Sequence, residues 1–228
     1  MIEDTAKAII KGLHSQKDIE KGRMVAKYMK TSRLEFQGVL VPEIRKTARR
    51  HIRSVPLESL PSLAQRLWAN KIFEPRLAGV EIMELYSKKG DIDTAIATIS
   101  WMIDRIDTLS LCDPLCIVCL GTLMIRDASV QERIADWRKS DNFWRRRATV
   151  LPYVHLGKKT IYRSEYGKMI LDGVTYHLSD SNLFVAKAVG WALREYSKKE
   201  PEVVREFIEE HKDIMPKLAV REGSKKLK

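Results

Sequence analysis

Apolar residues recur at helical spacing along nearly the whole chain, and no segment shows sustained two-residue alternation between hairpin turns. Proline and glycine separate these segments, as at Pro42 before one of them and at Gly90 after a basic last turn in another. The pattern predicts an all-α protein. The expected helices are Ile2–Leu13, Ile19–Met29, Pro42–Arg53, Pro61–Trp68 (with Pro56 before it), Pro75–Lys89, Ile92–Ile106, Pro114–Met124, Val130–Trp137, Asn142–Tyr153, Tyr162–Leu178, Leu183–Ser197 and Pro201–His211.

The predicted helices form pairs about every 35–45 residues, which is the period of helical repeat proteins. A single pair cannot bury its apolar face, so each pair needs its neighbours. We therefore predict an α-solenoid of antiparallel helix pairs that occupies residues 1–228 as one helical-repeat domain. The repeats are degenerate, and an irregular helical bundle is the alternative.

The net charge favours a polyanionic partner. A formal charge of +11 and an isoelectric point near 9.6 are unusual, whereas 44% hydrophobic and 31% charged residues are ordinary for a globular protein. Nucleic acid is the first candidate and an anionic membrane the second. A surplus that serves only solubility is the alternative.

Targeting signals are not evident in the sequence. We expect no membrane-spanning helix, which would need a run of about 18 apolar residues. The first ten residues lack the basic-then-apolar order of a signal peptide. A cytoplasmic location is therefore expected.

The three cysteines, Cys112, Cys116 and Cys119, lie on one face of a predicted helix with no histidine close by. This arrangement favours small buried thiols in a reducing compartment. A zinc site or a disulfide is the alternative.

The stretch N-F-W-R-R-R-A-T-V-L, residues 142–151, sets a permanent cation in an apolar stripe. On a helix, Arg147 falls beside Phe143, Val150 and Leu151, while Arg145 and Arg146 point toward water or an anion. A guanidinium held against a core needs an anionic partner, because an uncompensated buried charge costs about 3–5 kcal/mol. The alternative is that Arg147 snorkels past the stripe to solvent.

Asp113 stands directly before Pro114, as an N-cap stands before the first helical residue. We expect its carboxylate at a helix start, within reach of Arg147 on a neighbouring repeat. An aspartate kept ionised by backbone N–H groups is suited to facing a developing positive charge.

Gly190 lies in the middle of a predicted helix, where glycine costs about 1 kcal/mol relative to alanine. We therefore expect a neighbouring segment to approach its backbone closely. Trp191, the next residue, is interpreted as core packing when taken alone.

Four stretches together resemble the AlkD-like DNA alkylation repair family, in order from Met24 to Arg221. They are M-V-A-K-Y-M-K with F-Q-G-V-L-V-P downstream, F-E-P-R-L-A-G-V-E-I, N-F-W-R-R-R-A-T-V-L, and F-V-A-K-A-V-G-W-A-L-R-E-Y-S-K-K-E-P. The resemblance implies a curved stack of HEAT-like repeats whose basic concave face holds duplex DNA. It also implies hydrolysis of the N-glycosidic bond of cationic N3- and N7-alkylpurines, without insertion of the base into a pocket.

Within this resemblance, the catalytic carboxylate of the family falls on Asp113, its arginine on Arg147 and an aromatic residue on Trp191. Trp144 also lies among the expected lesion-facing residues. The family has tryptophan and aspartate where this sequence has Leu109 and Ser110, so a π face beside the cationic nucleotide is lost. A register with Cys116 at the carboxylate position fits less well.

Contacts to DNA should be made mostly to phosphates, because no base-reading helix is evident. The first candidates are Arg145, Arg146, Lys158 and Lys159, and the second are Lys46, Arg49 and Arg50. No metal or organic cofactor is expected, and the chain is expected to act as a monomer on double-stranded DNA.

Two other functions stay open. A non-catalytic DNA-binding repeat protein is favoured by Leu109 and Ser110. A protein-binding scaffold fits the solenoid but leaves the charge unexplained.

Overall fold

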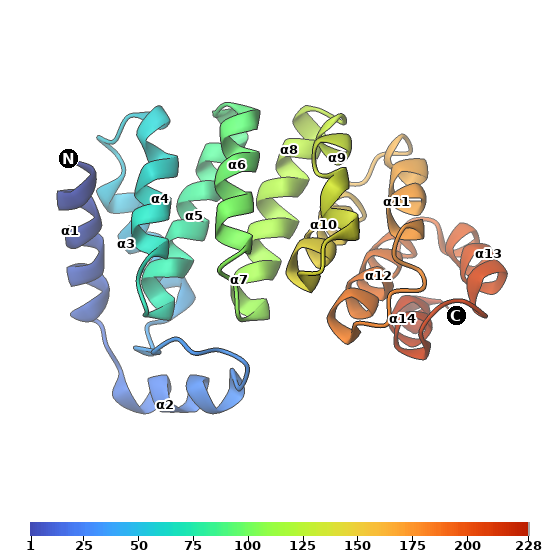
Figure 1. Cartoon of the computed structure of the whole chain (residues 1–228), viewed down its shortest axis with the longest axis horizontal. Coiled ribbons are helices and arrows are strands. Elements are labelled where there is room, and N and C mark those ends of the chain that lie inside the picture. Colours follow the sequence, from blue (N-terminus) through green and yellow to red (C-terminus); the bar gives the residue numbers. More distant parts are fainter. Residues whose placement is uncertain (228) are drawn as a thin grey trace. The chain divides into compact units, whose positions relative to one another are not determined.

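The structure is a computed structural model that describes residues 1–227, and helices form its regular elements (Figure 1). Over this range the only strand-like pairing is an isolated bridge between Glu35 and Ile72. The predicted all-α class is confirmed. The chain divides into two compact units, one ending at Leu115 and the other beginning at Cys116. That the whole chain acts as one domain stays a prediction.

The first unit contains seven α-helices among its described residues. They are α1 (Ile2–His14), α2 (Ile19–Tyr28), α3 (Val41–His51), α4 (Leu60–Trp68, preceded by the 3₁₀ turn Leu57–Ser59), α5 (Phe73–Lys89), α6 (Ile92–Ile103) and α7 (Leu109–Pro114).

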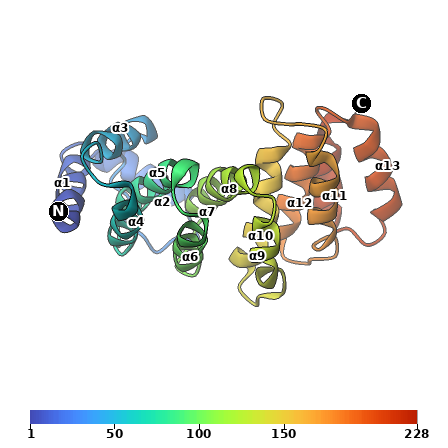
Figure 2. The ribbon, with the colours of Figure 1, turned by 90° about the horizontal axis from the view of Figure 1, so that it is seen from above.

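Within this unit, α5 packs against α3, α4 and α6, and α1 covers α3 and α4. Seen from above, α3 and α5 lie on one side and α4 and α6 on the other (Figure 2). Fully buried side chains such as Leu63, Leu67, Ile82 and Ile99 fill the space between these layers. The unit is therefore a set of helix pairs of the predicted kind, each of which needs its neighbour to bury its apolar face.

Helix α2 lies apart from this layered arrangement and buries only Gly22 (Figure 1). Asp18 caps the helix by accepting a hydrogen bond from the backbone N–H of Lys21 at 3.0 Å. Gly38 has φ +79°, and a Cβ there would lie 2.3 Å from the carbonyl oxygen of Asp18. Only glycine allows this conformation and this close approach, which hold the segment before α3 against α2.

The second unit starts within the π-helical segment Leu115–Leu120. Its helices are α8 (Gly121–Arg126), α9 (Val130–Arg133), the 3₁₀ segment Ala135–Lys139, α10 (Phe143–Leu156), α11 (Tyr166–Thr175), α12 (Leu183–Tyr196), α13 (Pro201–His211), α14 (Lys217–Gly223) and the 3₁₀ turn Ser224–Lys226.

Helix α10 packs against α8, α11 and α12, and α12 packs against α14. Asparagine caps both long helices: Asn142 accepts a hydrogen bond from the N–H of Trp144 at 3.0 Å, and Asn182 accepts one from Phe184 at 2.9 Å. A Cβ on Gly190 would lie 2.6 Å from the carbonyl oxygen of Ala219 on α14. The close approach predicted at Gly190 is therefore confirmed.

The predicted bounds of α13 match the structure, and most other predicted bounds differ by one to four residues. Helix α14 was not predicted. The prediction that a helix begins at Pro114 is wrong, because α7 begins at Leu109 with Thr108 as its N-cap. Pro114 lies inside the helical stretch and lacks an N–H group. The π-helical turns that follow show how the chain continues past this break in the hydrogen-bond ladder.

One stretch, Leu109–Arg126, is long and apolar enough to cross a membrane, with a mean hydropathy of 1.7 over 18 residues. The expectation that no such run occurs is therefore corrected. However, 56% of this stretch is buried within the protein, and a core helix passes the same test of length and composition. Core packing accounts for its apolar character.

Candidate functional site

In the first unit, α7 carries the predicted carboxylate. Leu109, Ser110 and Asp113 are partly exposed, whereas Leu111 and Cys112 are buried. Leu109 and Asp113 are four residues apart and therefore neighbours on the helix surface. The structure thus brings the three predicted residues of this segment to one face.

The local reason for this arrangement differs from the one predicted. Asp113 is not an N-cap but the fifth residue of α7, and the cap is Thr108, whose hydroxyl accepts the N–H of Ser110 at 3.4 Å. The Ser110 hydroxyl donates to the Met29 sulfur at 3.3 Å, which ties α7 to the end of α2. Asp113 is therefore positioned by the short helix between a threonine cap and a proline.

The predicted buried thiols are confirmed, since Cys112, Cys116 and Cys119 are all buried. Among residues 1–227, no group of three or more His, Cys, Asp or Glu side chains is arranged to hold a metal ion.

In the second unit, an aromatic cluster joins α10 to α12. The ring centroids of Phe143 and Phe184 are 5.4 Å apart, and those of Trp144 and Phe184 are 5.6 Å apart, with both pairs stacked. Trp144 is 8% exposed, so most of its surface serves packing. Offset stacking of this kind adds about 0.5–1.5 kcal/mol beyond the area that it buries.

Arg147 follows on α10 and is 1% exposed. Its Nη1 donates a hydrogen bond to the carbonyl oxygen of Phe184 on α12. The predicted burial of this guanidinium is confirmed, and the alternative that it snorkels to solvent is wrong.

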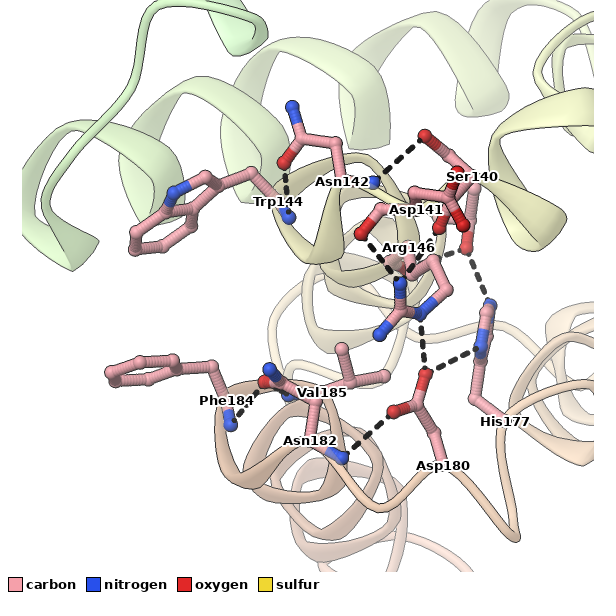
Figure 3. Close-up of polar contacts among 11 residues, drawn as sticks. Ser140, Asp141, Asn142, Trp144, Arg146, His177, Asp180, Asn182, Phe184 and Val185 are labelled. Carbon is pink, nitrogen blue, oxygen red and sulfur yellow. Dashed lines mark hydrogen bonds and ion pairs between the residues drawn. The ribbon is translucent and has the colours of Figure 1, made fainter.

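Arg146 is held by an ion pair and two carbonyl groups (Figure 3). Its Nε donates to Asp180 Oδ2 at 2.8 Å, and its Nη1 donates to the carbonyl oxygens of Ser140 at 2.7 Å and Asp141 at 3.2 Å. These contacts tie the start of α10 to the segment before α12. Phosphate binding by Arg146 stays a prediction, but it would compete with three contacts already made.

His177 completes this group, since its Nε2 lies 2.8 Å from the Thr149 hydroxyl and its Nδ1 lies 3.7 Å from Asp180 Oδ2. Burial lowers the pKa of His177 to about 4, although the negative charge of Asp180 acts in the opposite direction and favours the protonated ring. The pKa of Asp180 is lowered as well. Burial alone would raise it, but hydrogen bonds from Arg146 and from the N–H of Asn182 outweigh that effect.

Other predicted phosphate contacts of the second unit lie near its surface. The Arg145 guanidinium carbon is 5.3 Å from the centroid of the Trp137 ring, a cation–π contact. Lys159 is exposed and Lys158 is partly exposed. Both lysines therefore present charge to solvent.

Trp191, on α12, is partly exposed rather than buried in the core, and Arg194 lies 5.9 Å from its ring centroid. Its interpretation as plain core packing is therefore incomplete, because part of the ring is available for contact with another molecule.

Helix α3 carries a basic groove of about 560 Å³. Its lining residues recur at intervals of three and four along α3 and the turn after it, and they are Pro42, Arg45, Lys46, Arg49, Arg50 and Arg53. Arg45 pairs with Glu81 at 2.7 Å, and Lys46 makes a loose pair with Glu43 at 3.7 Å. In the described part of the chain no carboxylate lies within ion-pair distance of Arg49, Arg50 or Arg53. The groove therefore offers at least three guanidinium groups to an anion.

A model of the family described as DNA alkylation repair enzyme matches residues 9–227. The chain belongs to the DNA alkylation repair enzyme family. The resemblance of its four motifs to this family is thereby confirmed. A search of curated proteins found no match.

Three solved structures are similar in fold to this chain. A predicted DNA alkylation repair enzyme from Enterococcus faecalis has a TM-score of 0.78 and 22% identity, with 93% of this chain and 97% of that chain covered. AlkD2 from Streptococcus mutans has a TM-score of 0.66 and 20% identity over 91% of this chain and 99% of that chain. The protein smu.31 from Streptococcus mutans UA159 has a TM-score of 0.66 and 19% identity, with 91% of this chain and 100% of that chain covered. At these identities the similarity shows the fold alone.

Sequence reasoning missed two sets of residues. The first set is Asp180, which pairs with Arg146, and His177, which contacts Asp180 and Thr149. The second is Glu74 and Glu81 on α5, which are 2% and 3% exposed. The D-S-N sequence before Leu183 was a usable signal for a polar cap at residues 180–182. Nothing local marked the two glutamates as buried.

Proposed function

We propose that the chain binds alkylated duplex DNA and hydrolyses the N-glycosidic bond of cationic N3- and N7-alkylpurines. The observation that carries this proposal is the carboxylate of Asp113, which is partly exposed on α7 in a chain of the DNA alkylation repair family. Cytoplasmic location and a monomeric state stay predictions.

In the proposed reaction, the bond between C1′ and the purine nitrogen breaks and the base leaves with the bonding electrons. Because the alkylated purine is cationic, it departs as a neutral molecule. Asp113 stabilises the positive charge that develops on the sugar and accepts a proton from the water that adds to C1′. Arg147 takes the place of the arginine of the family, and Trp191 offers an aromatic face to the lesion.

Phosphate contacts are proposed at Arg49 and Arg50 with Lys46 on α3, and at Lys158 and Lys159 after α10. The groove along α3 supports the first set, since several guanidinium groups converge there. Arg145 is retained as a candidate. Binding that falls steeply with salt is expected for contacts of this kind.

The proposal is tested by incubating the protein with duplex DNA that contains N7-methylguanine and measuring released base above the spontaneous rate. Asp113→Asn should abolish the enzymatic part of the release. Asp172→Asn is a matched control, because Asp172 lies on the exposed side of α11 and pairs with Lys168. Release that is unchanged by Asp113→Asn would remove Asp113 from the reaction.

The second candidate is a DNA-binding protein without excision activity. It is favoured by Leu109, which stands beside Asp113 on α7 without a π face. Salt-dependent duplex binding with no release by the wild type, and none after Leu109→Trp, would select this candidate.

A further inference from the structure

Two buried carboxylates line a cavity of about 510 Å³ in the first unit. Glu74 is 2% exposed and Glu81 is 3% exposed. The remaining wall is mostly apolar and includes Met24, Phe73 and Leu77, although the side chains of Lys21 and Arg45 also line the cavity. A cavity of this size, apolar with a few convergent polar groups, has the character of a small-molecule site.

Two motifs that the proposed reaction does not use supply Glu74 and its partners, and Ser110 and Pro114 of α7 also line the cavity. Glu74 belongs to F-E-P at the start of α5, and its Oε1 accepts the backbone N–H groups of Gln37 at 2.9 Å and Gly38 at 2.8 Å, which belong to F-Q-G. Backbone hydrogen bonds from Glu35 to Lys71 and from Phe73 to Glu35, both 2.9 Å, hold the two segments side by side. The position of Glu74 is therefore fixed.

Each carboxylate keeps one oxygen without a partner. Within residues 1–227, the Oε2 atoms of Glu74 and Glu81 are buried and accept no hydrogen bond, although Glu81 Oε1 accepts Arg45 Nε at 2.7 Å. Buried polar atoms in folded proteins nearly always have partners, so each such oxygen points to a donor that binds there. Among the described residues, the hydrogen bonds that Glu74 accepts come from two neutral backbone N–H groups, which favours a cationic donor for its other oxygen.

The spacing of these oxygens narrows the class of ligand. Glu74 and Glu81 are seven residues apart on α5, so they share one face and lie about 10 Å apart along the helix axis. Leu77 lies between them on the same face. A linear ligand with a cationic group at each end and an apolar middle matches this order of anionic, apolar and anionic groups in the cavity.

We propose that this cavity binds an aliphatic α,ω-diamine or a longer polyamine. One ammonium group donates to Glu74 Oε2 and the other to Glu81 Oε2, while the methylene chain lies over Leu77. This binding site goes beyond the proposed repair reaction and does not depend on it. Because the chain carries a net charge of +11, non-specific attraction of a dication to its surface is weak, and binding reports on the cavity.

Isothermal titration calorimetry of the full chain with putrescine, cadaverine and hexamethylenediamine tests this proposal, with pentylamine as the monoamine control. The best diamine should bind about tenfold or more tightly than pentylamine, since only a diamine satisfies both oxygens. The affinity of the diamines should pass through a maximum as their methylene chain lengthens. Equal binding of pentylamine, a flat length series or no measurable heat would each overturn the proposal.

Glu81→Gln locates the site. It should remove the preference for the diamine over pentylamine and leave pentylamine binding unchanged within about twofold. Glu84→Gln is the matched control, because Glu84 lies on the same helix, is partly exposed and pairs with Lys88 at 3.3 Å. Equal losses in both variants would assign binding to surface charge and overturn the proposal. Circular dichroism checks that each variant is folded, and the length series on the wild type does not depend on any variant.

Discussion

Arg146 Nε donates to Asp180 Oδ2 at 2.8 Å, across 34 residues of sequence, and joins the start of α10 to the segment before α12. The Arg146 side chain is 21% exposed and that of Asp180 is 10% exposed, so the pair is largely removed from water. With two carbonyl groups on its Nη1, this guanidinium holds the second unit together. The central arginine run therefore contains at least one residue with a structural role, Arg146, and the next residue, Arg147, is buried and donates to the carbonyl oxygen of Phe184.

Arg146→Gln should lower the free energy of unfolding by about 2 kcal/mol or more, because it leaves Asp180 partly buried without its charged partner. Urea unfolding followed by circular dichroism measures this change. Lys158→Gln is the control and should change stability by less than about 0.5 kcal/mol, as surface substitutions usually do. Equal stability of the Arg146→Gln variant and the wild type would contradict the structural role.

Stability should fall as the pH is lowered from 6.5 toward 4, because of His177. Its pKa is lowered from 6.5 to about 4 by burial, so in this window the unfolded chain binds a proton that the folded chain does not. The loss should reach about 3 kcal/mol at the low end. The lowered pKa of Asp180 acts at more acidic pH, since its stabilisation is lost only as that carboxylate protonates.

Urea unfolding at several pH values measures this dependence in the wild type and in His177→Gln. The variant should lose less stability than the wild type between pH 6.5 and 4, by up to about 3 kcal/mol. Parallel curves for the two proteins would show that His177 does not titrate differently on folding.

Gly190→Ala should lower the free energy of unfolding by about 1–3 kcal/mol, the usual cost of overpacking a core. The added Cβ would lie 2.6 Å from the Ala219 carbonyl oxygen, and this backbone atom cannot move without shifting α14. Thermal unfolding measures the effect. Gly223→Ala is the matched control, because its Cβ meets the end of the Ile208 side chain at 3.1 Å, which can rotate away. Equal effects of the two substitutions would contradict the importance of the close approach.

The parts of the fold that could be predicted from sequence are those set by local chemistry. Pro201 fixes the start of α13, and Asn142 and Asn182 cap the two long helices. The cost of glycine within a helix indicated that a neighbouring segment approaches Gly190. It did not indicate that this segment is α14, because the contact joins segments that are distant in sequence. The burial of Arg147 followed from its place in an apolar stripe.

The errors arose where two local signals competed or where a partner lies far along the chain. Asp113-Pro114 has the order of a helix start, yet Thr108 starts the helix first and the chain passes Pro114 through π-helical turns. Arg146 and Arg145 are equivalent in the sequence pattern, but Arg146 pairs with Asp180 and Arg145 lies over the Trp137 ring. The buried oxygens of Glu74 and Glu81 depend on packing between α5, α2 and the segment before α3, which no local pattern encodes.

Replacing Arg49 and Arg50 together by glutamine should weaken duplex DNA binding and flatten its salt dependence. If both guanidinium groups contact phosphates, the slope of log K against log salt should fall in magnitude by about 2, since each contact contributes about 0.9. Fluorescence anisotropy with a labelled duplex at several salt concentrations measures this slope. Lys168→Gln is the control and should leave the slope unchanged, because Lys168 is exposed on α11, pairs with Asp172 and is not among the proposed contacts. An unaltered slope in the double variant would exclude the α3 groove as the DNA contact.

Leu109→Trp should increase the excision of N7-methylguanine by about twofold to thirtyfold. Leu109 and Asp113 are neighbours on the partly exposed face of α7, so an indole at position 109 would lie beside the nucleotide that faces the carboxylate. A cation–π contact with the alkylated purine contributes about 0.5–2 kcal/mol, and each 1.36 kcal/mol changes the rate about tenfold. Single-turnover release measures the rate, and Leu109→Phe should give a smaller gain because its π face is weaker. A rate that falls or stays constant in Leu109→Trp, while duplex binding is retained, would show that the missing aromatic face does not limit the reaction.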